Sequence, residues 1–422
     1  MPHQAALTII APVEEEQDNA LERLLEDLGQ KPDALPFAAL PNLHFARLFV
    51  LGASADLAGA RLGPQLVFLS DLDAPVEPYL PDLVDAFGPA IDTIFGHCVG
   101  WPRSHAATRD ARIAFLRSHS RKAAAAYVNT VGRSVDQILH EDALRRAIER
   151  FLDAPENDWP EATPVQVRAA IREWVFGEDA LRWASRPAEP PERWWRAREA
   201  VHAILAPLLL LILLPILILV LPVWAVLLRL HERSDVPEHD QPDPERVEAL
   251  TVMEDHVVQN PFTAVGLLKP GLFRRLTFQA VLQAVSYGVR HIFNRGRLSG
   301  IKTIHFARWV FIDERRRLFF ASNYDGSQES YMDDFIDKVA WGLNAVFSNG
   351  MGYPRTRWLI QNGAKDEEAF KGYLRVHQVL TPIWYSAYPD LTAANVENNS
   401  RIRAGLYGSM TPQETKAWLR RL

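Results

Sequence analysis

The polar residues that could carry chemistry gather in the second half of the chain. Asp325 stands in Asn323-Tyr324-Asp325-Gly326-Ser327, directly after an apolar run that predicts a β-strand. Asp-Gly at this place is typical of a turn, in which Gly326 supplies backbone freedom and the carboxylate accepts hydrogen bonds from nearby amides. The alternative is an acid at a strand end that points into a cleft and moves protons there. Both interpretations of Asp325 stay open from the sequence.

A histidine and several arginines are the other candidates. His377 ends the amphipathic stretch Tyr373-Leu374-Arg375-Val376-His377. A neutral imidazole that faces an apolar cleft can ligate haem iron, whereas a satisfied core histidine is the plainer interpretation. Arginine binds carboxylates such as propionates through paired hydrogen bonds. The candidate cofactor- or substrate-binding residues besides His377 are Arg308, Arg355, Arg357, Tyr385 and Arg403.

Composition and missing motifs remove several classes of function. The chain has no phosphate loop, no Gly-x-Ser-x-Gly elbow, no His-Glu-x-x-His and no paired cysteine ligands. A net charge of −6 argues against nucleic acid as the main partner, because phosphate binding needs a basic surface. The single cysteine, Cys98, cannot form an internal disulfide and fits a reducing compartment. No signal peptide is recognisable over Met1–Gln17, so we expect the soluble parts in the cytoplasm.

One apolar segment is long enough to enter a membrane. Residues Ala203 to Leu228 carry no charge, and about 20 apolar residues span a bilayer. Three prolines interrupt this run: Pro207, Pro215 and Pro222. Two topologies follow, one kinked spanning helix or a hairpin of two limbs joined at Pro215 that leaves the membrane where it entered. We favour the hairpin, because the internal repeat described next places both ends of the segment on one side of the membrane.

Two stretches of the chain repeat each other. His44–Val50 returns as His305–Phe311, and Ser70–Arg103 aligns without gaps on Ser322–Arg355. Ten of the 34 aligned pairs in the second stretch are identical, which indicates a duplication.

Each copy is predicted to run strand, helix, strand, strand, helix, strand, which is the ferredoxin-like order. The strands expected in the first copy are Leu7–Val13, Leu43–Leu51, Gln65–Ser70 and Arg112–Leu116, and its helices are Glu15–Leu28 and Tyr79–Phe95. The second copy is expected to have strands Thr263–Leu268, Thr303–Ile312 and Leu318–Ser322, and helices Leu272–Asn294 and Tyr331–Phe347. Two such sheets can bury their bare faces against each other. Both copies then lie on one side of the membrane.

The predicted fold is α+β, with two tandem ferredoxin-like repeats of the dimeric α/β-barrel type and an inserted apolar membrane segment. The predicted domains are repeat 1 (1–153), an amphipathic Trp/Arg-rich helical region (154–200), the membrane segment (201–230), an acidic Pro-rich linker (231–261) and repeat 2 with C-terminal helices (262–422).

This duplicated order resembles the dimeric α/β-barrel superfamily, which includes dye-decolourising peroxidases and chlorite dismutases. In those peroxidases a histidine binds haem iron, and an acid in a Gly-x-x-Asp-Gly loop acts on peroxide together with an arginine. Ser322–Gly326 keeps the Asp-Gly and lacks the leading glycine. The resemblance implies His377 as the iron ligand, Asp325 as the acid, and Arg355 or Arg308 as the arginine.

Three functional hypotheses result. The leading one is a membrane-anchored, haem-dependent, peroxidase-like oxidoreductase. The second is a non-catalytic module that holds a lipid or apolar ligand between the sheets at the membrane surface, and the third is a haem-free enzyme acting on lipid-derived substrates. The second rests on the membrane segment and on the aromatic residues Trp309, Trp341, Trp358, Trp384 and Tyr385. Membrane lipid and a small-molecule or lipid-like substrate are the expected partners, with a homo-oligomer left open.

Overall fold

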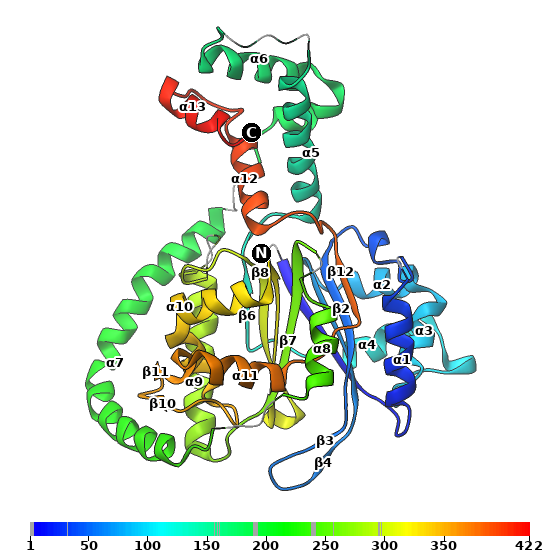
Figure 1. The fold of residues 1–422 in the computed structure, drawn as a ribbon, viewed down its shortest axis with the longest axis vertical. Coiled ribbons are helices and arrows are strands. Elements are labelled where there is room, and N and C mark those ends of the chain that lie inside the picture. The colour runs from blue at the N-terminus through cyan, green and yellow to red at the C-terminus, as the bar shows by residue number, and fades with distance from the viewer. Residues whose placement is uncertain are drawn as a thin grey trace.

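Two four-stranded antiparallel sheets form the centre of the molecule (Figure 1). The computed structural model describes residues 4–31, 33–155, 157, 159, 161–188, 193–237, 242–255, 257–293, 296 and 298–422. Sheet I has the strand order β1 (Gln4–Pro12), β5 (Gln65–Asp73), β2 (Leu43–Leu51), β12 (Ile383–Ser386). Sheet II has the order β6 (Ala125–Val128), β8 (Ile304–Ile312), β9 (Arg317–Asp325), β7 (Gln259–Leu267). The predicted α+β class with antiparallel sheets is confirmed.

The fourth strand of each sheet comes from the other half of the chain. β6, from the first half, pairs with β8, so that Tyr127 lies opposite Ala307. β12, from the second half, pairs with β2, so that Tyr385 lies opposite Ala46. The sheets therefore do not form two self-contained units. The two halves are held to each other by backbone hydrogen bonds in both sheets.

The predicted fourth strand of the first half is wrong. Arg112–Leu116 lies within α4 (Arg109–Ser118), which begins after Thr108, whose hydroxyl accepts a hydrogen bond from the Ala111 amide. A threonine cap and buried apolar residues at Ile113 and Leu116, three apart, are the features of a helix. The strand is β6 instead.

The two sheets pack face to face, as expected from the bare faces of the predicted units. Phe49 of β2 and Phe319 of β9 stack with ring centroids 5.9 Å apart, within a fully buried apolar layer. Burial on both faces explains why β2 and β8 are almost continuously apolar in sequence instead of alternating, apart from one histidine and one arginine in each. Two residues packed against this layer, Val265 and Val379, also line a cavity of about 780 Å³.

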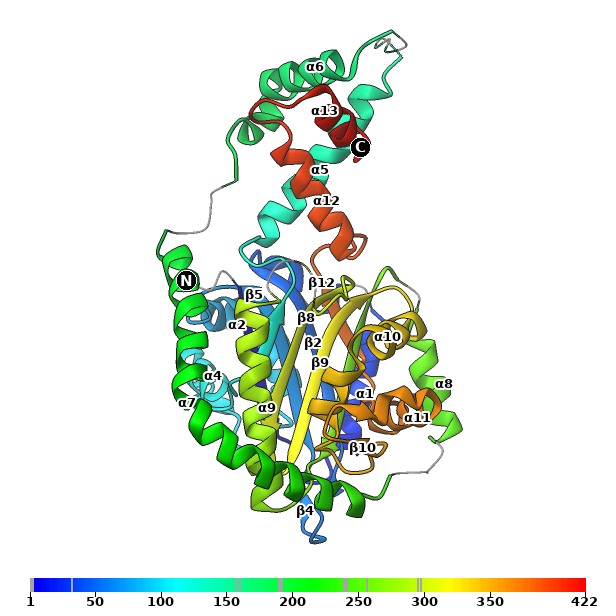
Figure 2. The ribbon, with the colours of Figure 1, turned by 90° about the vertical axis from the view of Figure 1, so that its left-hand side faces the viewer.

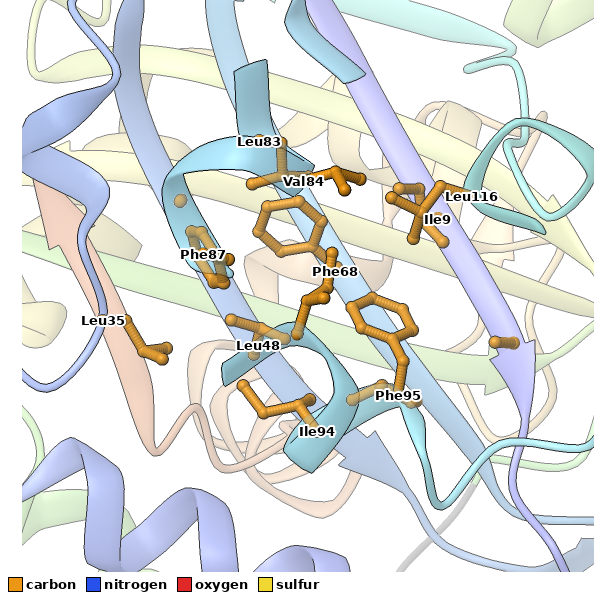
Figure 3. Packing of buried hydrophobic residues seen from close by; sticks show 14 of the residues in the cluster. Ile9, Leu35, Leu48, Phe68, Leu83, Val84, Phe87, Ile94, Phe95 and Leu116 are labelled. Carbon is orange, nitrogen blue, oxygen red and sulfur yellow. The ribbon is translucent and has the colours of Figure 1, made fainter. Parts of the chain in front are cut away.

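Helices cover the outer face of each sheet. Sheet I carries α1 (Asp18–Gly29), α2 (Tyr79–Phe87), α3 (Pro89–Phe95) and α4. Figure 3 shows apolar side chains of α2, α3 and α4 packed against those of β1, β2 and β5. Sheet II carries α9 (Leu272–His291), α10 (Gln328–Phe347) and α11 (Glu367–His377). The predicted helix Tyr79–Phe95 is interrupted at Gly88, which has φ +51°, and α3 begins at Pro89. Glycine adopts this backbone conformation at little cost, and proline is favoured as a first helical residue.

A helical extension projects from one end of the sheets (Figure 2). It consists of α5 (Val135–Leu152), α6 (Pro164–Gly177), α12 (Ala393–Ala404) and α13 (Pro412–Leu419). These helices share a small core of their own around Ile171, Ile402 and Trp418. The remaining short elements are α8 (Pro244–Val252) and the two-stranded pairs β3 (Ser54–Ala55) with β4 (Arg61–Leu62) and β10 (Thr356–Arg357) with β11 (Gln361–Asn362).

The apolar segment is a single helix, α7 (Arg193–Ser234), which curves along the outside of the molecule (Figure 1). The predicted hairpin with a turn at Pro215 is wrong, because one continuous helix contains all three prolines, although each proline lacks the N–H that would close a helical hydrogen bond. At 3.6 residues per turn, Pro207, Pro215 and Pro222 lie within about 80° of one another around the axis. Prolines on one side of a helix bend it repeatedly in the same direction, which gives a curve instead of a reversal.

Within the described ranges, α7 is the one helix long and apolar enough to cross a membrane by length and composition. Its 35-residue part Ala200–Ser234 has a mean hydropathy of 3.3 over its most apolar window, and none of that window is buried inside the molecule.

Candidate functional site

Arg308, predicted to contact a substrate, lies buried between the two sheets. Its guanidinium donates hydrogen bonds to the Leu7 carbonyl (2.6 Å), to the Thr8 hydroxyl (3.2 Å) and to the Ser70 carbonyl (3.1 Å). It also pairs with the Asp71 carboxylate. These partners occupy the guanidinium and fix sheet I to sheet II, so Arg308 has a structural role.

Asp325, the predicted acid, ends β9 and is also buried. One carboxylate oxygen lies 2.6 Å from Nε2 of His305, and the other accepts from the Ala393 amide at 2.8 Å, at the first turn of α12. The equivalent Asp73 contacts His44 and the amide that begins α5 in the same way. Asp325 is thus a helix cap and a partner of His305. The turn interpretation, in which the carboxylate accepts from nearby amides, is wrong in that part, because the amide that Asp325 accepts from lies 68 residues further along the chain.

The other predicted arginines and Tyr385 lie in three separate places. Arg355 donates to the Asp235 carbonyl (2.8 Å) just after α7, and the side chain of Arg357 is exposed nearby. Arg403 belongs to the helical extension, where it contacts Glu141 at 3.3 Å. Tyr385, on β12 of sheet I, stacks on Phe37 with ring centroids 5.2 Å apart.

His377 borders a cavity of about 780 Å³ at the end of α11. Its Nδ1 donates to the Tyr373 carbonyl at 2.9 Å, and its ring edge approaches the backbone of Gly266. Glu22 and Arg317 also line this cavity, and burial together with the nearby Asp18 and Glu26 raises the pKa of Glu22.

The predicted haem residues are not assembled around one space. The described lining of the His377 cavity includes neither Asp325 nor any of the predicted arginines or Tyr385. Asp325 and Arg308 are committed to other groups. These residues do not fit a single haem site, and the peroxidase hypothesis stays a prediction that the arrangement does not favour.

A second cavity, of about 420 Å³, lies between α9 and α10 over the outer face of sheet II. From α9 it is lined by residues at helical spacing, and from α10 by residues around a kink at Val339 (φ −138°, ψ 19°). The sheet and α11 close it with aromatic and aliphatic side chains. The lining residues from the two long helices include Val281, Val285, Gly288, Met332, Phe335, Val339, Trp341, Gly342 and Ala345, and Ile292 follows the end of α9.

The wall of this cavity is apolar, with few polar exceptions. Ser299 and the Tyr331 hydroxyl, which bonds Ser322 at 2.6 Å, are two of them. The third is Trp309, which is buried and whose Nε1 has no hydrogen-bond partner among the described residues. A buried, unpaired donor costs free energy, so an acceptor oxygen on a ligand would relieve that cost. The described wall carries no carboxylate, histidine, cysteine or lysine.

Two exposed apolar side chains mark the rim of the same cavity. Ile292 is 62% exposed and Trp341 is 50% exposed. The sequence singled out Trp309 and Trp341 as part of an aromatic cluster but placed the ligand between the sheets. A further sequence feature that marks this cavity is a pair of glycines, Gly288 on α9 and Gly342 on α10, which leave room between the helices.

Three acidic residues on α10 and α11 form ion pairs with one lysine side chain. Nζ of Lys371 lies 2.5 Å from Glu329, 2.7 Å from Asp333 and 2.6 Å from Glu367. The ammonium group takes the place that a metal ion would need.

Known proteins offer no guide to the site. No protein-family model matches the chain, and no curated protein is significantly similar to it. The geometry of the apolar cavity is therefore the basis for the functional conclusion.

Proposed function

We propose that this protein is a membrane-attached module that holds an apolar ligand, an acyl chain or a molecule of similar shape, in the cavity between α9 and α10. The observation that carries the proposal is the cavity itself, with its apolar wall and a volume within the range of small-molecule sites. A wall without described titratable groups other than Tyr331 suits binding more than acid–base catalysis.

The position of the cavity supports a ligand that arrives from a membrane. α9 provides one wall of the cavity and is also the helix that α7 contacts, through Trp224 and Thr277 (3.0 Å) among others. The exposed rim residues Ile292 and Trp341 would continue the apolar surface of α7 towards the opening. Large exposed apolar patches on soluble monomers are uncommon and mark interaction surfaces.

We also infer that the two halves descend from one ferredoxin-like unit and have exchanged their fourth strands. The support is a set of matched contacts. Gln4 at the start of β1 donates to the carbonyls of Thr130 and Arg133, and Gln259 at the start of β7 donates to those of Tyr388 and Leu391. The hydroxyls of Ser70 and Tyr79 pair at 2.9 Å, and those of Ser322 and Tyr331 in the second half pair at 2.6 Å.

Mass spectrometry of lipids that co-purify in detergent tests the proposed function. Gly288→Leu places a side chain where an added Cβ meets only the Phe293 ring at 3.5 Å, so the variant fills cavity space and gains helix propensity. The matched control is Gly177→Leu on α6, an exposed helical glycine with open space around it.

We expect a specific lipid or fatty acid at a fixed ratio in the wild type and in Gly177→Leu, and a several-fold loss of it in Gly288→Leu. Lipid bound around α7 serves as an internal reference for the amount of co-purified lipid, because neither Gly288→Leu nor Gly177→Leu changes a residue of that helix. Equal amounts of every lipid in all three proteins would contradict the proposal.

A further inference from the structure

We infer that α7 lies within a single leaflet of a membrane, as a submerged arch whose two ends emerge on the same side. This assignment goes beyond ligand binding and names the surface that the arch fits: the acyl chains of one leaflet. Three independent features of the structure carry it.

The first feature is the strand exchange across α7. β6 precedes α7 in the chain and pairs with β8, which follows it. β12 follows α7 and pairs with β2, which precedes it. A helix that crossed the bilayer once would put these partners on opposite sides of the membrane. Both sheets can form only if the two ends of α7 share one side.

The second feature is that both ends of α7 rest on the same helix. Near its start, the His202 ring lies 4.2 Å from the His291 ring at the end of α9. Near its end, the Trp224 indole donates to Thr277 at 3.0 Å, and the His231 ring stacks on Phe273 at 5.0 Å, at the start of α9.

The downstream end is fixed by buried charges as well. The Glu232 carboxylate accepts from the amides of Leu359 (2.7 Å) and Trp358 (3.0 Å), two successive residues with positive φ whose N–H groups converge on it. Asp235 pairs with Lys269 (2.6 Å) and Arg274 (2.7 Å). These contacts hold the end of the helix against sheet II and its loops.

The third feature is the length of helix between the two fixed ends. His202 to His231 is 29 residues, about 43 Å of helix, whereas Phe273 to His291 is 18 residues, about 27 Å. The excess length bows outward, as Figure 1 shows. Apart from Leu217, the leucine, isoleucine and valine side chains from Ile204 to Val223 are 43–75% exposed.

The amino-acid composition of the arch indicates which environment surrounds it. A helix that lies at the membrane interface has a polar face, but residues 203–228 carry no charge on any face. A helix that is apolar all round belongs inside hydrocarbon. Because both ends return to one side, the arch reaches into one leaflet, about 15 Å of the roughly 30 Å core. A second copy of the chain or a soluble partner could cover the arch only with a matching apolar surface. The experiments below distinguish these two protein interfaces from a lipid environment.

Cysteine labelling in sealed vesicles tests this topology in the full chain. Asp179→Cys lies upstream of α7, Glu248→Cys lies downstream of it, and Leu219→Cys lies at the exposed middle of the arch. The native Cys98 gives little background, since it is buried and burial raises the pKa of its thiol to about 12.

A membrane-impermeant maleimide should label Asp179→Cys and Glu248→Cys from the same side, and Leu219→Cys only after detergent is added. Labelling of the first two from opposite sides would overturn the inference in favour of a single crossing. Labelling of Leu219→Cys without detergent would also overturn it, because the arch would then face water.

The depth of residue 219 in the bilayer distinguishes a lipid environment from an interface with a second copy of the chain. A fluorophore on Leu219→Cys should be quenched by lipids brominated in the middle of their acyl chains. No quenching by those lipids, together with protection from the maleimide, would assign the arch to a protein interface and overturn the inference.

Discussion

Arg47 and Arg308 hold equivalent places in the two sheets, and each guanidinium donates hydrogen bonds to the sheet opposite its own. Arg47 reaches the Phe262 carbonyl (2.9 Å), the Thr263 hydroxyl (2.8 Å) and the Ser322 carbonyl (2.7 Å). Arg308 makes the matching contacts to Leu7, Thr8 and Ser70.

One difference breaks this symmetry: Arg308 pairs with Asp71, whereas Arg47 meets Asn323 at the corresponding place. The Asn323 amide in turn donates to the second Asp71 oxygen at 3.0 Å. Two buried guanidinium groups thus share one carboxylate, and burial lowers the pKa of Arg47 to about 9, against the attraction of Asp71.

We therefore expect Asp71→Asn to destabilise the protein strongly. The substitution leaves two buried positive charges without a counter-charge, and breaking a buried ion pair costs about 3–5 kcal/mol. Chemical denaturation measures the free energy of unfolding. Asp390→Asn, at an exposed loop position, is the control and should change stability by less than about 0.5 kcal/mol. Similar small effects from both variants would show that the cross-sheet network contributes little.

Glu232→Gln should loosen the contact between α7 and the loop at 356–359. The amide side chain keeps one acceptor oxygen, so one of the two bound N–H groups loses its partner at a cost of about 1–3 kcal/mol. Hydrogen–deuterium exchange at the Trp358 and Leu359 amides should become faster, and exchange in Glu248→Gln should match the wild type. Unchanged protection of both amides in Glu232→Gln would refute the role assigned to this carboxylate.

Stability should fall above pH 10. Burial raises the pKa of Tyr79 and of Tyr331 above the usual value of 10.0. Above pH 10 the unfolded chain therefore releases protons that the native protein keeps, so the native state loses relative stability; below pH 10 the contribution is fully present. Absorbance at 295 nm reports tyrosinate. Ionisation of these residues should coincide with unfolding, and their reversible titration near pH 10 in the folded protein would contradict the prediction.

Trp309→Phe should discriminate between ligand types. The variant keeps most of the apolar volume but removes the unpaired indole N–H of a residue that lines the cavity. A net hydrogen bond of about 0.5–1.5 kcal/mol predicts roughly 2- to 10-fold weaker binding of a radiolabelled fatty acid, with little change for an alkane of the same length. Equal loss for both ligands would indicate a packing effect, and no loss for either would remove Trp309 from the site.

The local elements were largely predictable from the sequence, because long apolar runs and helical spacing determine them. The expected strand Leu43–Leu51 is β2 itself, and Thr303–Ile312 differs from β8 by one residue. The fourth strand, Ala125–Val128, was missed because four small and apolar residues carry almost no periodic signal. Its exchange between sheets depends on long-range pairing that no local pattern encodes.

The site was much less predictable. Asp325, Arg308 and His377 were chosen for their chemistry, yet Asp325 and Arg308 serve helix capping and sheet packing. Polar residues that stabilise a fold and polar residues that bind ligands look alike in one sequence. The apolar cavity depends on how α9 and α10 diverge around Gly288, Gly342 and the kink at Val339, which is a property of packing and not of composition.

Photo-crosslinking with a fatty acid that carries a diazirine in its chain tests the central claim most directly. Digestion and mass spectrometry of the labelled wild-type protein should locate the crosslinks in α9 and α10, on residues that line the cavity. An excess of unlabelled fatty acid should compete these crosslinks away, and Gly288→Leu should reduce them several-fold. Crosslinks confined to α7, with none on α9 or α10, would show that lipid only surrounds the apolar helix and would contradict a ligand site in the cavity.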